Sequence, residues 1–268
     1  MAAHDFLAHW DKELIAARRL GMAEHHVTFT VALDRSYTAL SPAQQAHLRA
    51  LSCFSFPFFA EGAALLWSKS TDLSEEVSEG KDTQEASEAR MQAIRELLGA
   101  FVHRSLLEVD GKFPDDTPVT YRFQPALRQA LARRVSESEQ KDVEAGYAAY
   151  GAWLARRGYG DIHKDPALAR LVQLSLEALE AATDTLTGTD RLWHIKRLAW
   201  IEAAYGRTGA AQALLESALP PTNPLPNPTA DREGAQADSA LRHEMAQVYV
   251  TRGDLDRALQ LYQESLRL

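Results

Sequence analysis

The stretch Glu85–Val135 constrains the fold of this chain most, because the spacing of its apolar residues changes from helical to alternating and back. A stripe at helical spacing predicts a helix over Glu85–Arg104, and its members are Met91, Ile94, Leu97, Leu98, Phe101 and Val102. Short strands are predicted over Ser105–Val109 and Val119–Phe123, with the polar, turn-forming stretch Asp110–Pro118 between them. A second helix runs to Val135. We therefore expect a mainly α-helical chain with a small β-hairpin.

The order helix, strand, turn-rich loop and strand is typical of a winged-helix unit, and we assign residues 27–135 to such a domain. Helices are predicted upstream over Val27–Leu40, from Pro42 to about Leu51, and over Glu61–Trp67. The last of these packs against an aromatic cluster at Phe54, Phe56, Phe58 and Phe59. The start of the second helix is marked by Ser41-Pro42-Ala43-Gln44. There Ser caps the helix, Pro takes its first position and Gln completes a capping box.

Two further segments are expected to lie outside the winged-helix elements. Residues 1–26 carry an amphipathic stripe over residues 2–22, which predicts the tail of a preceding helical domain. Thr71–Glu88 is acidic and poor in apolar residues, which predicts an exposed insertion.

From residue 136 to residue 268 the predicted elements are all helices. Apolar and aromatic positions from Val143 to Leu154 line a helix that ends near Gly158. The later helices are predicted over Leu168–Leu186, Leu192–Tyr205, Ala210–Leu219, Asp238–Arg252 and Leu255–Leu268. Residues 219–236 are rich in proline and are interpreted as an extended linker.

The last pair of helices follows the tetratricopeptide pattern, in which small residues let two helices approach and aromatic residues fill the space between them. Its pattern positions are Met245, Ala246, Tyr249, Gly253, Ala258 and Tyr262. The preceding pair is a weaker copy, with Ile201, Tyr205 and Gly209 placed in register. We expect a right-handed helical stack of degenerate tetratricopeptide type, and a chain that is a fragment of a longer solenoid protein.

Composition narrows the classes of function. A single cysteine excludes an internal disulfide, and no apolar run is long enough to cross a membrane, so a cytoplasmic protein without a membrane partner is expected. Net charge is −8. Residues 27–135 hold 12 Lys and Arg against 14 Asp and Glu, so nucleic acid is not expected as a partner.

Reactive residues are few, and each has a structural interpretation that we prefer. Cys53 lies in an apolar run and is expected to be a small buried hydrophobe. His25 and His26 point to different faces of a helix and have no third metal ligand nearby. The aromatic residues Tyr147, Trp153, Trp193 and Trp200 either form a binding wall or, as is commoner at helical spacing, belong to the core. No catalytic site and no metal site are therefore predicted.

Two separated runs resemble the winged-helix region of the STAND class of signalling NTPases, the NB-ARC relatives. They are Leu33–Phe54, and Leu97–Glu108 followed by Tyr121–Ala132. The resemblance implies a winged helix that acts as a regulatory hinge between a nucleotide-binding core and a repeat sensor. It also implies a nucleotide-sensor position before the last winged-helix helix, where relatives carry His and this chain carries Gln124. Glutamine donates hydrogen bonds but carries no charge. The chain contains no G-x-x-x-x-G-K-[ST] motif, so ADP or ATP is expected only in a longer parent protein.

The predicted function is that of a non-catalytic regulatory and sensor fragment of a bacterial-type STAND signalling protein. Its partners would be a protein or peptide on the repeats and an NTPase core within the parent protein. The outward residues of the first helix of the last pair, His243, Gln247 and Thr251, are the predicted protein-binding residues. A stand-alone protein–protein adaptor is the second hypothesis, and a winged-helix DNA-binding regulator is the third.

Overall fold

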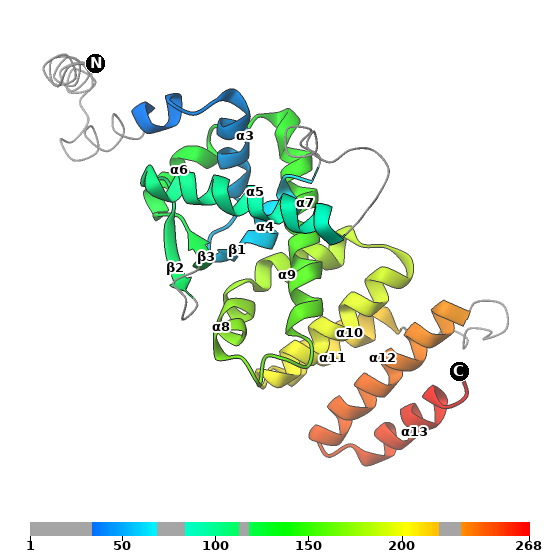
Figure 1. Cartoon of the computed structure of the whole chain (residues 1–268). Coiled ribbons are helices and arrows are strands. Elements are labelled where there is room, and N and C mark those ends of the chain that lie inside the picture. Colours follow the sequence, from blue (N-terminus) through cyan, green and yellow to red (C-terminus); the bar gives the residue numbers. More distant parts are fainter. Residues whose placement is uncertain (1–33, 69–83, 113–117, 220–231) are drawn as a thin grey trace, which may run out of the picture. The chain divides into compact units, whose positions relative to one another are not determined.

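A computed structural model describes residues 34–68, 84–112, 118–219 and 232–268, and these residues are mainly α-helical with one small antiparallel sheet (Figure 1). The chain divides into two compact units, Met1–Val143 and Glu144–Leu268, which are described separately below. The coarse fold class predicted from the sequence is therefore confirmed. The helix predicted over residues 2–22, His25 and His26 lie outside the described residues.

The first unit contains the helices that the apolar stripes predict, with small shifts at their ends. Asp34–Thr38 is helical, so the described part of the helix predicted over Val27–Leu40 is present. The other helices of this unit are α3 (Pro42–Leu51), α4 (Ala60–Leu66), α5 (Gln84–His103), α6 (Pro125–Ala132) and the first part of α7 (Glu137–Gly158). Residues 84–88, the end of the acidic stretch, belong to α5, in agreement with the helix predicted from Glu85. The rest of that insertion, residues 71–83, is outside the described residues.

The start of α3 confirms the predicted capping box. The Ser41 hydroxyl accepts a hydrogen bond from the Gln44 N–H at 3.2 Å, and the Gln44 side chain accepts one from the Ser41 N–H at 3.1 Å. Pro42 stands at the first helical position, where its missing N–H costs nothing. Each bond satisfies a backbone donor that the first turn leaves unpaired.

The sheet has the strand order β1-β3-β2 and is antiparallel throughout. Its strands are β1 (Phe58–Phe59), β2 (Glu108–Lys112) and β3 (Pro118–Arg122). The predicted first hairpin strand, Ser105–Val109, is wrong in its start, because Ser105 adopts a left-handed conformation (φ 58°) and Leu106 and Leu107 are buried in the link after α5. β1 was not predicted, and it is too short to show an alternating pattern.

Aromatic packing joins β1 to β3 and to the segment that follows α3. Phe58 stacks on Phe54 with ring centroids 4.5 Å apart and pairs with Tyr121 in the sheet. These three rings are almost completely buried, as are Phe101 of α5 and Trp67 after α4. The aromatic cluster predicted after α3 is therefore the core of this unit.

An ion pair anchors the start of α7 to α3. The Arg49 guanidinium hydrogen-bonds to the carboxylate of Glu139, and Glu139 also accepts from the N–H and the hydroxyl of Ser136. Burial alone would raise the pKa of Glu139, but these hydrogen bonds outweigh it and the pKa is lowered. Glu139 therefore stays ionised and paired at neutral pH.

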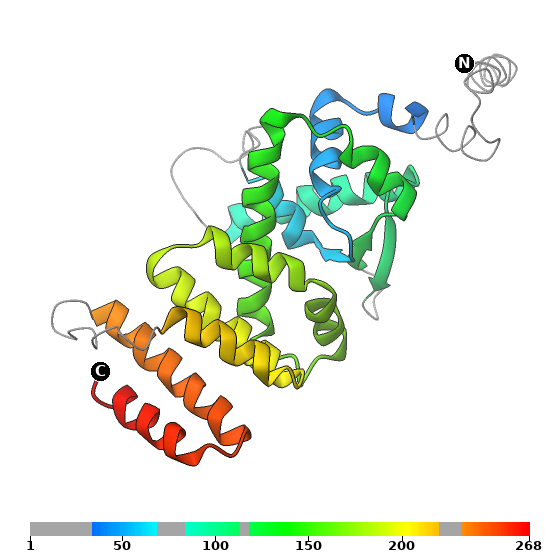
Figure 2. The same cartoon turned by 180° about the vertical axis from the view of Figure 1, so that it is seen from behind.

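The second unit consists of helices, as predicted, but two predicted boundaries are wrong. α7 ends at Gly158 as expected. The single helix predicted over Leu168–Leu186 is divided into α8 (Pro166–Leu174) and α9 (Leu176–Thr185), because the backbone leaves the helical region at the buried Ser175 (φ −102°, ψ 18°). α12 (Arg232–Thr251) begins earlier than Asp238, so residues 232–236 belong to a helix and not to the linker. The remaining helices are α10 (Gly188–Ala204), α11 (Thr208–Ala218) and α13 (Leu255–Ser265) (Figure 2).

Two helix pairs of this unit, α10–α11 and α12–α13, are equivalent at an interval of 47 positions. Gly206 and Gly253 each lie in the turn between the helices with positive φ (77° and 81°), a conformation that favours glycine. The buried alanines follow the same interval: Ala199 matches Ala246, and Ala211 matches Ala258. The predicted register with Gly209 is therefore wrong, because Gly209 lies inside α11.

The two pairs fill the space between their helices with different side chains. At the position of Tyr249 in the second pair, the first pair has Glu202, which is buried and forms a bidentate ion pair with Arg207. In the second pair, the Arg257 guanidinium lies over the Tyr249 ring, 5.4 Å from its centroid. In both pairs, an arginine near the turn lies against the side chain that fills this space: Arg207 against Glu202, and Arg257 against Tyr249.

A buried arginine also joins α12 to α13. The Arg242 Nε lies 2.8 Å from Asp238 Oδ1, although without hydrogen-bond geometry, and its Nη1 donates to Glu264 at 2.5 Å. The Arg242 side chain is 10 % exposed. Because the two acids lie on different helices, the guanidinium is paired only when α12 and α13 keep this register.

A very close contact between helices of the second unit depends on Gly151 of α7. A Cβ at this position would lie 1.8 Å from the carbonyl oxygen of Ala178 on α9, so only glycine fits. Gly99, in the interior of α5, is a matched contrast, because a Cβ there has nothing within 4 Å.

We predict that Gly151→Ala destabilises the chain by about 1–3 kcal/mol, because the contact is with backbone that cannot rotate away. Gly99→Ala is expected to stabilise it by about 0.5–1 kcal/mol, the usual gain from replacing glycine in a helix. Urea unfolding followed by circular dichroism measures both. Equal effects of the two substitutions would show that α7 and α9 do not pack this closely.

Candidate protein-binding groove

The three predicted protein-binding residues form one exposed row along α12. His243, Gln247 and Thr251 are spaced by four positions and are all exposed. The Gln247 and His243 side chains are hydrogen-bonded through their Nε2 atoms at 3.0 Å, and the Thr251 hydroxyl donates to the Gln247 carbonyl at 3.0 Å. The structure thus places them on one face, which remains a predicted binding face.

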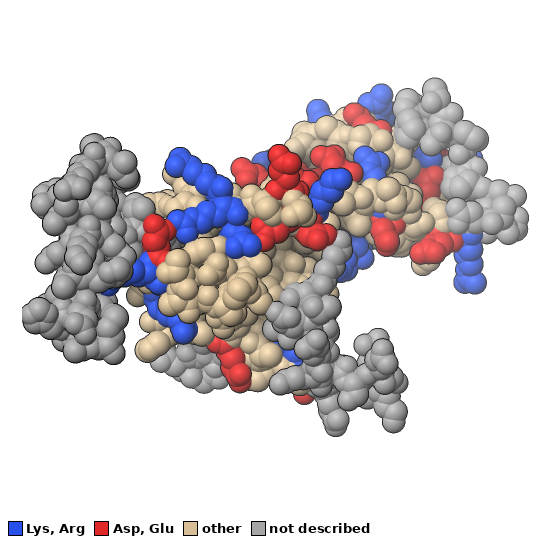
Figure 3. Space-filling model, turned by 90° about the horizontal axis from the view of Figure 1, so that it is seen from above, with Lys and Arg blue, Asp and Glu red and all other residues tan. Residues whose placement is uncertain are grey.

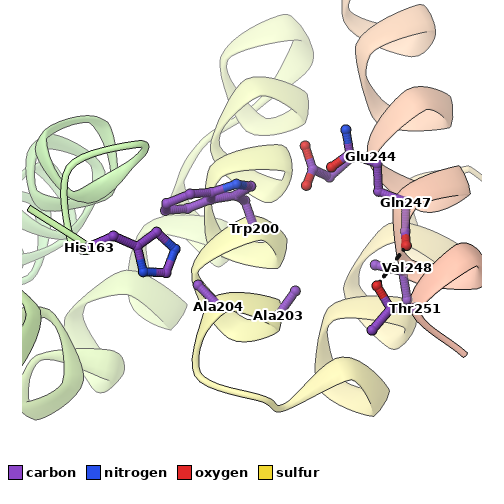
Figure 4. A pocket seen from close by; sticks show the side chains of 8 residues that line it. All are labelled: His163, Trp200, Ala203, Ala204, Glu244, Gln247, Val248 and Thr251. Carbon is purple, nitrogen blue, oxygen red and sulfur yellow. Dashed lines mark hydrogen bonds between the residues drawn. The ribbon is translucent and has the colours of Figure 1, made fainter.

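A hollow of about 140 Å³ lies between this face of α12 and α10 (Figure 4). Gln247 and Thr251 line it, whereas His243 does not and packs edge-on against Tyr262 of α13 at 5.2 Å. The other lining residues are His163 before α8, Trp200, Ala203 and Ala204 of α10, and Glu244 and Val248 of α12. The small side chains of the two alanines leave the floor of the hollow open.

Trp200 forms the aromatic wall of the hollow. It is half-buried and meets Tyr159 and His163 edge-on, with centroids 5.1 and 5.4 Å from its own. The preferred expectation that Trp200 belongs to the core is therefore wrong. Tyr147, Trp153 and Trp193 are likewise only half-buried, but they do not line this hollow.

A lysine of α10 is held beside this wall by aromatic groups. The Lys196 ammonium donates to the Tyr159 hydroxyl at 2.9 Å. It also lies 4.8 Å from the centroid of the Tyr159 ring and 5.5 Å from that of Trp193. These contacts fix the charge of Lys196 against two electron-rich rings.

Glu244 is the most unusual residue of the hollow. The residue is only 4 % exposed, and within the described residues no hydrogen bond to its carboxylate is formed. Its oxygens are not among the fully enclosed polar atoms without a partner, so they open onto the hollow that Glu244 lines. Its side chain points from α12 toward Trp200, as does that of Gln247 (Figure 4). Burial raises the pKa of Glu244, and the positive charge of Lys196 offsets only part of this increase. A buried carboxylate without a donor is costly and calls for a functional explanation.

Glu244 interrupts an apolar stripe of α12, which is a signal visible in the sequence. Leu241, Met245 and Val248 are buried on one face of α12, and Glu244 lies three positions after the first and four before the last. A carboxylate within an apolar stripe is exceptional, because Glu is seldom buried without a partner. Trp200 and His163 carry no comparable signal, since their place in the groove depends on packing between helices distant in sequence.

The predicted nucleotide-sensor residue, Gln124, lies in the first unit at the N-cap of α6. Its amide donates to Glu108 Oε1 at 2.8 Å, and this bond, with those from Arg122, lowers the pKa of Glu108. Arg122 forms ion pairs with Glu108 at 3.1 Å and Asp110 at 3.2 Å. Gln124 is therefore already bound by a carboxylate, and a phosphate at this place would meet that negative charge.

Other residues offer little chemistry. Cys53 is half-buried, and burial raises the pKa of its thiol well above the usual range. Among the residues that the structure describes, no group of three or more His, Cys, Asp or Glu is placed to hold a metal ion. No helix in the described ranges is long and apolar enough to span a membrane. On the face drawn in Figure 3, acidic and basic side chains are interspersed.

Comparisons with protein-family profiles, with curated proteins and with solved structures find no match to this chain.

We predict that Glu244→Gln becomes more stable than the natural chain as the pH rises from about 4 to 7. Between the unfolded pKa of about 4.3 and the raised folded pKa of Glu244, the native state binds the additional proton, so natural stability falls through this window. The side chain of glutamine does not ionise, so the variant does not lose stability in this way as the pH rises. Urea unfolding at several pH values measures the difference.

Glu177→Gln on the exposed face of α9 is the control, and its stability difference should not follow the same pH dependence. His163, which lines the hollow, and Lys196, whose charge acts on Glu244, are present in both proteins and are therefore common to the two sides of the comparison. A stability difference for Glu244→Gln that does not change with pH would contradict the burial of an unpaired carboxylate.

Proposed function

We propose that this chain is a non-catalytic regulatory and sensor portion of a STAND-type signalling protein, in which helical repeats bind a protein or peptide and a winged helix passes on the effect. The observation that carries the proposal is the hollow between α10 and α12, the first helices of two equivalent pairs. The first helices of tetratricopeptide pairs line the concave face on which such arrays bind extended peptides. A half-buried tryptophan beside exposed polar groups is typical of residues that dominate protein interfaces.

The first unit supports the regulatory part of the proposal. The antiparallel hairpin β2–β3 follows α5, and α6 follows the hairpin, which is the order expected of a winged helix and its wing. Gln124 stands at the position of the family's nucleotide-contacting histidine. The link from Gln124 to Glu108 gives it a local role in holding β2 to the start of α6.

A stand-alone adaptor is the second candidate, and the same groove supports it. The two candidates differ in what the complete gene encodes. A regulatory portion of a STAND protein requires a G-x-x-x-x-G-K-[ST] loop ahead of residue 1 in the full reading frame. A reading frame without that loop would leave the adaptor.

DNA binding is the weakest candidate. The hairpin and α5 resemble a DNA reader in arrangement only, because the net charge of the chain is −8 and the hairpin carries Glu108 and Asp110 beside Arg122. A salt-dependent shift of duplex DNA by the purified chain would revive it.

We predict that peptides selected on the full chain bind Trp200→Ala about thirtyfold more weakly, as for a tryptophan at the centre of an interface. Trp193→Ala is the matched control, because Trp193 also lies on α10 but not in the hollow. Peptides from a random phage-displayed library serve as probes, and fluorescence anisotropy measures their affinity. Equal loss with both variants, or no loss with either, would place the binding surface elsewhere.

In a protein that includes the nucleotide-binding core, Gln124→His is expected to tighten ADP binding, because imidazolium carries the positive charge that the amide lacks. Glu108→Gln combined with Gln124→His serves as control. It removes the carboxylate that would otherwise compete for the imidazolium. An unchanged ADP affinity in both variants would show that position 124 has only a structural role.

A further inference from the structure

The hollow between α10 and α12 contains a negative group without a partner. Glu244 is buried, with only 4 % of its surface exposed, and its side chain points toward Trp200 (Figure 4). No hydrogen bond from the described residues reaches the carboxylate, and its oxygens, which are not fully enclosed, face the hollow. A largely buried acid without a protein partner that opens onto a hollow is well placed to meet a ligand.

Lys196 is the positive group whose charge acts on Glu244, but its ammonium is bound by other residues. The Lys196 ammonium is bonded to the Tyr159 hydroxyl and lies over the rings of Tyr159 and Trp193. It acts on Glu244 only through its field. By contrast, the buried acid of the equivalent helix pair, Glu202, is neutralised by Arg207. Of these two buried acids, Glu202 therefore has an arginine bonded to it, whereas Glu244 has no bonded cation.

We propose that Glu244 and Trp200 form a subsite for the cationic end of a lysine or arginine side chain from a bound protein segment. The aliphatic stem would lie along the indole, and the cation would reach the carboxylate. Gln247 and Thr251 at the rim offer hydrogen bonds to the segment's backbone. This subsite deepens the proposed function and rests on it for the source of the side chain.

Other occupants fit the residues less well. An apolar side chain would complete the burial of the carboxylate without pairing it, which is costly. A metal ion needs several ligands, and Glu244 is the one acid among the described residues that line the hollow. An anion would be repelled. A cation with an apolar stem is the one chemistry that satisfies both the acid and the indole, because tryptophan attracts cations through its ring face.

The first experiment uses small probes on the full chain labelled with ¹⁵N. N-ethylguanidinium and n-butylammonium are expected to shift the indole N–H signal of Trp200 saturably, whereas n-butanol should not. Trp193, whose ring already faces Lys196, should shift little. In Glu244→Gln, which keeps the shape of the side chain, the affinity of both cations should fall about thirtyfold or more. Equal shifts in both proteins would overturn the subsite.

The second experiment separates the subsite from the proposed function. Peptides selected from a random library on the natural chain should be enriched in Lys or Arg and should bind Glu244→Gln about thirtyfold or more weakly. Selected peptides without basic residues, bound equally by Glu244→Gln, would overturn the subsite and leave the proposed function standing. Glu244-dependent binding of the small cations without any selected peptide would support the subsite and contradict peptide binding.

Discussion

The second unit depends on how closely its helices approach one another. Gly151 meets the backbone of Ala178 directly, and buried alanines occupy matching contacts in the two helix pairs. Small residues at these contacts bring helix backbones together, so that the larger side chains can interdigitate on either side. The hollow between α10 and α12 also depends on small residues, because Ala203 and Ala204 leave open the space that Trp200 and Glu244 border.

Local chemistry made much of the fold predictable, and long-range packing made the rest unpredictable. Ser41 and Gln44 specify the start of α3 through bonds within one turn, and the structure forms both bonds. β1 is a strand only because β3, distant in sequence, pairs with Phe58 and Phe59. Ser175 divides α8 from α9 although the apolar stripe continues through it. Periodicity reports which face is buried, but not where a backbone turns.

The residues around the hollow likewise divide into those that local spacing predicts and those that depend on long-range packing. The row His243, Gln247 and Thr251 follows from helical spacing alone, and the structure places all three on an exposed face. Glu244 could have been found from the sequence as an acid within an apolar stripe. Trp200 could not, because its spacing is equally consistent with a core position. Its role depends on which neighbours the fold provides. A buried acid lowers the stability of the folded chain, which helps to explain why such a residue is rare.

The different fillers of the two helix pairs bear on how this chain avoids misfolding. Repeat proteins risk exchanging equivalent helices between neighbouring units, because the units resemble one another. Here Glu202 needs Arg207 from its own turn, while Tyr249 is met by Arg257 from α13. Glu202 keeps its arginine whichever helix packs against α10, because Arg207 follows it in the same turn. An exchanged second helix would instead leave the Tyr249 ring without its cation, so the divergence at this shared position favours α13 as the partner of α12.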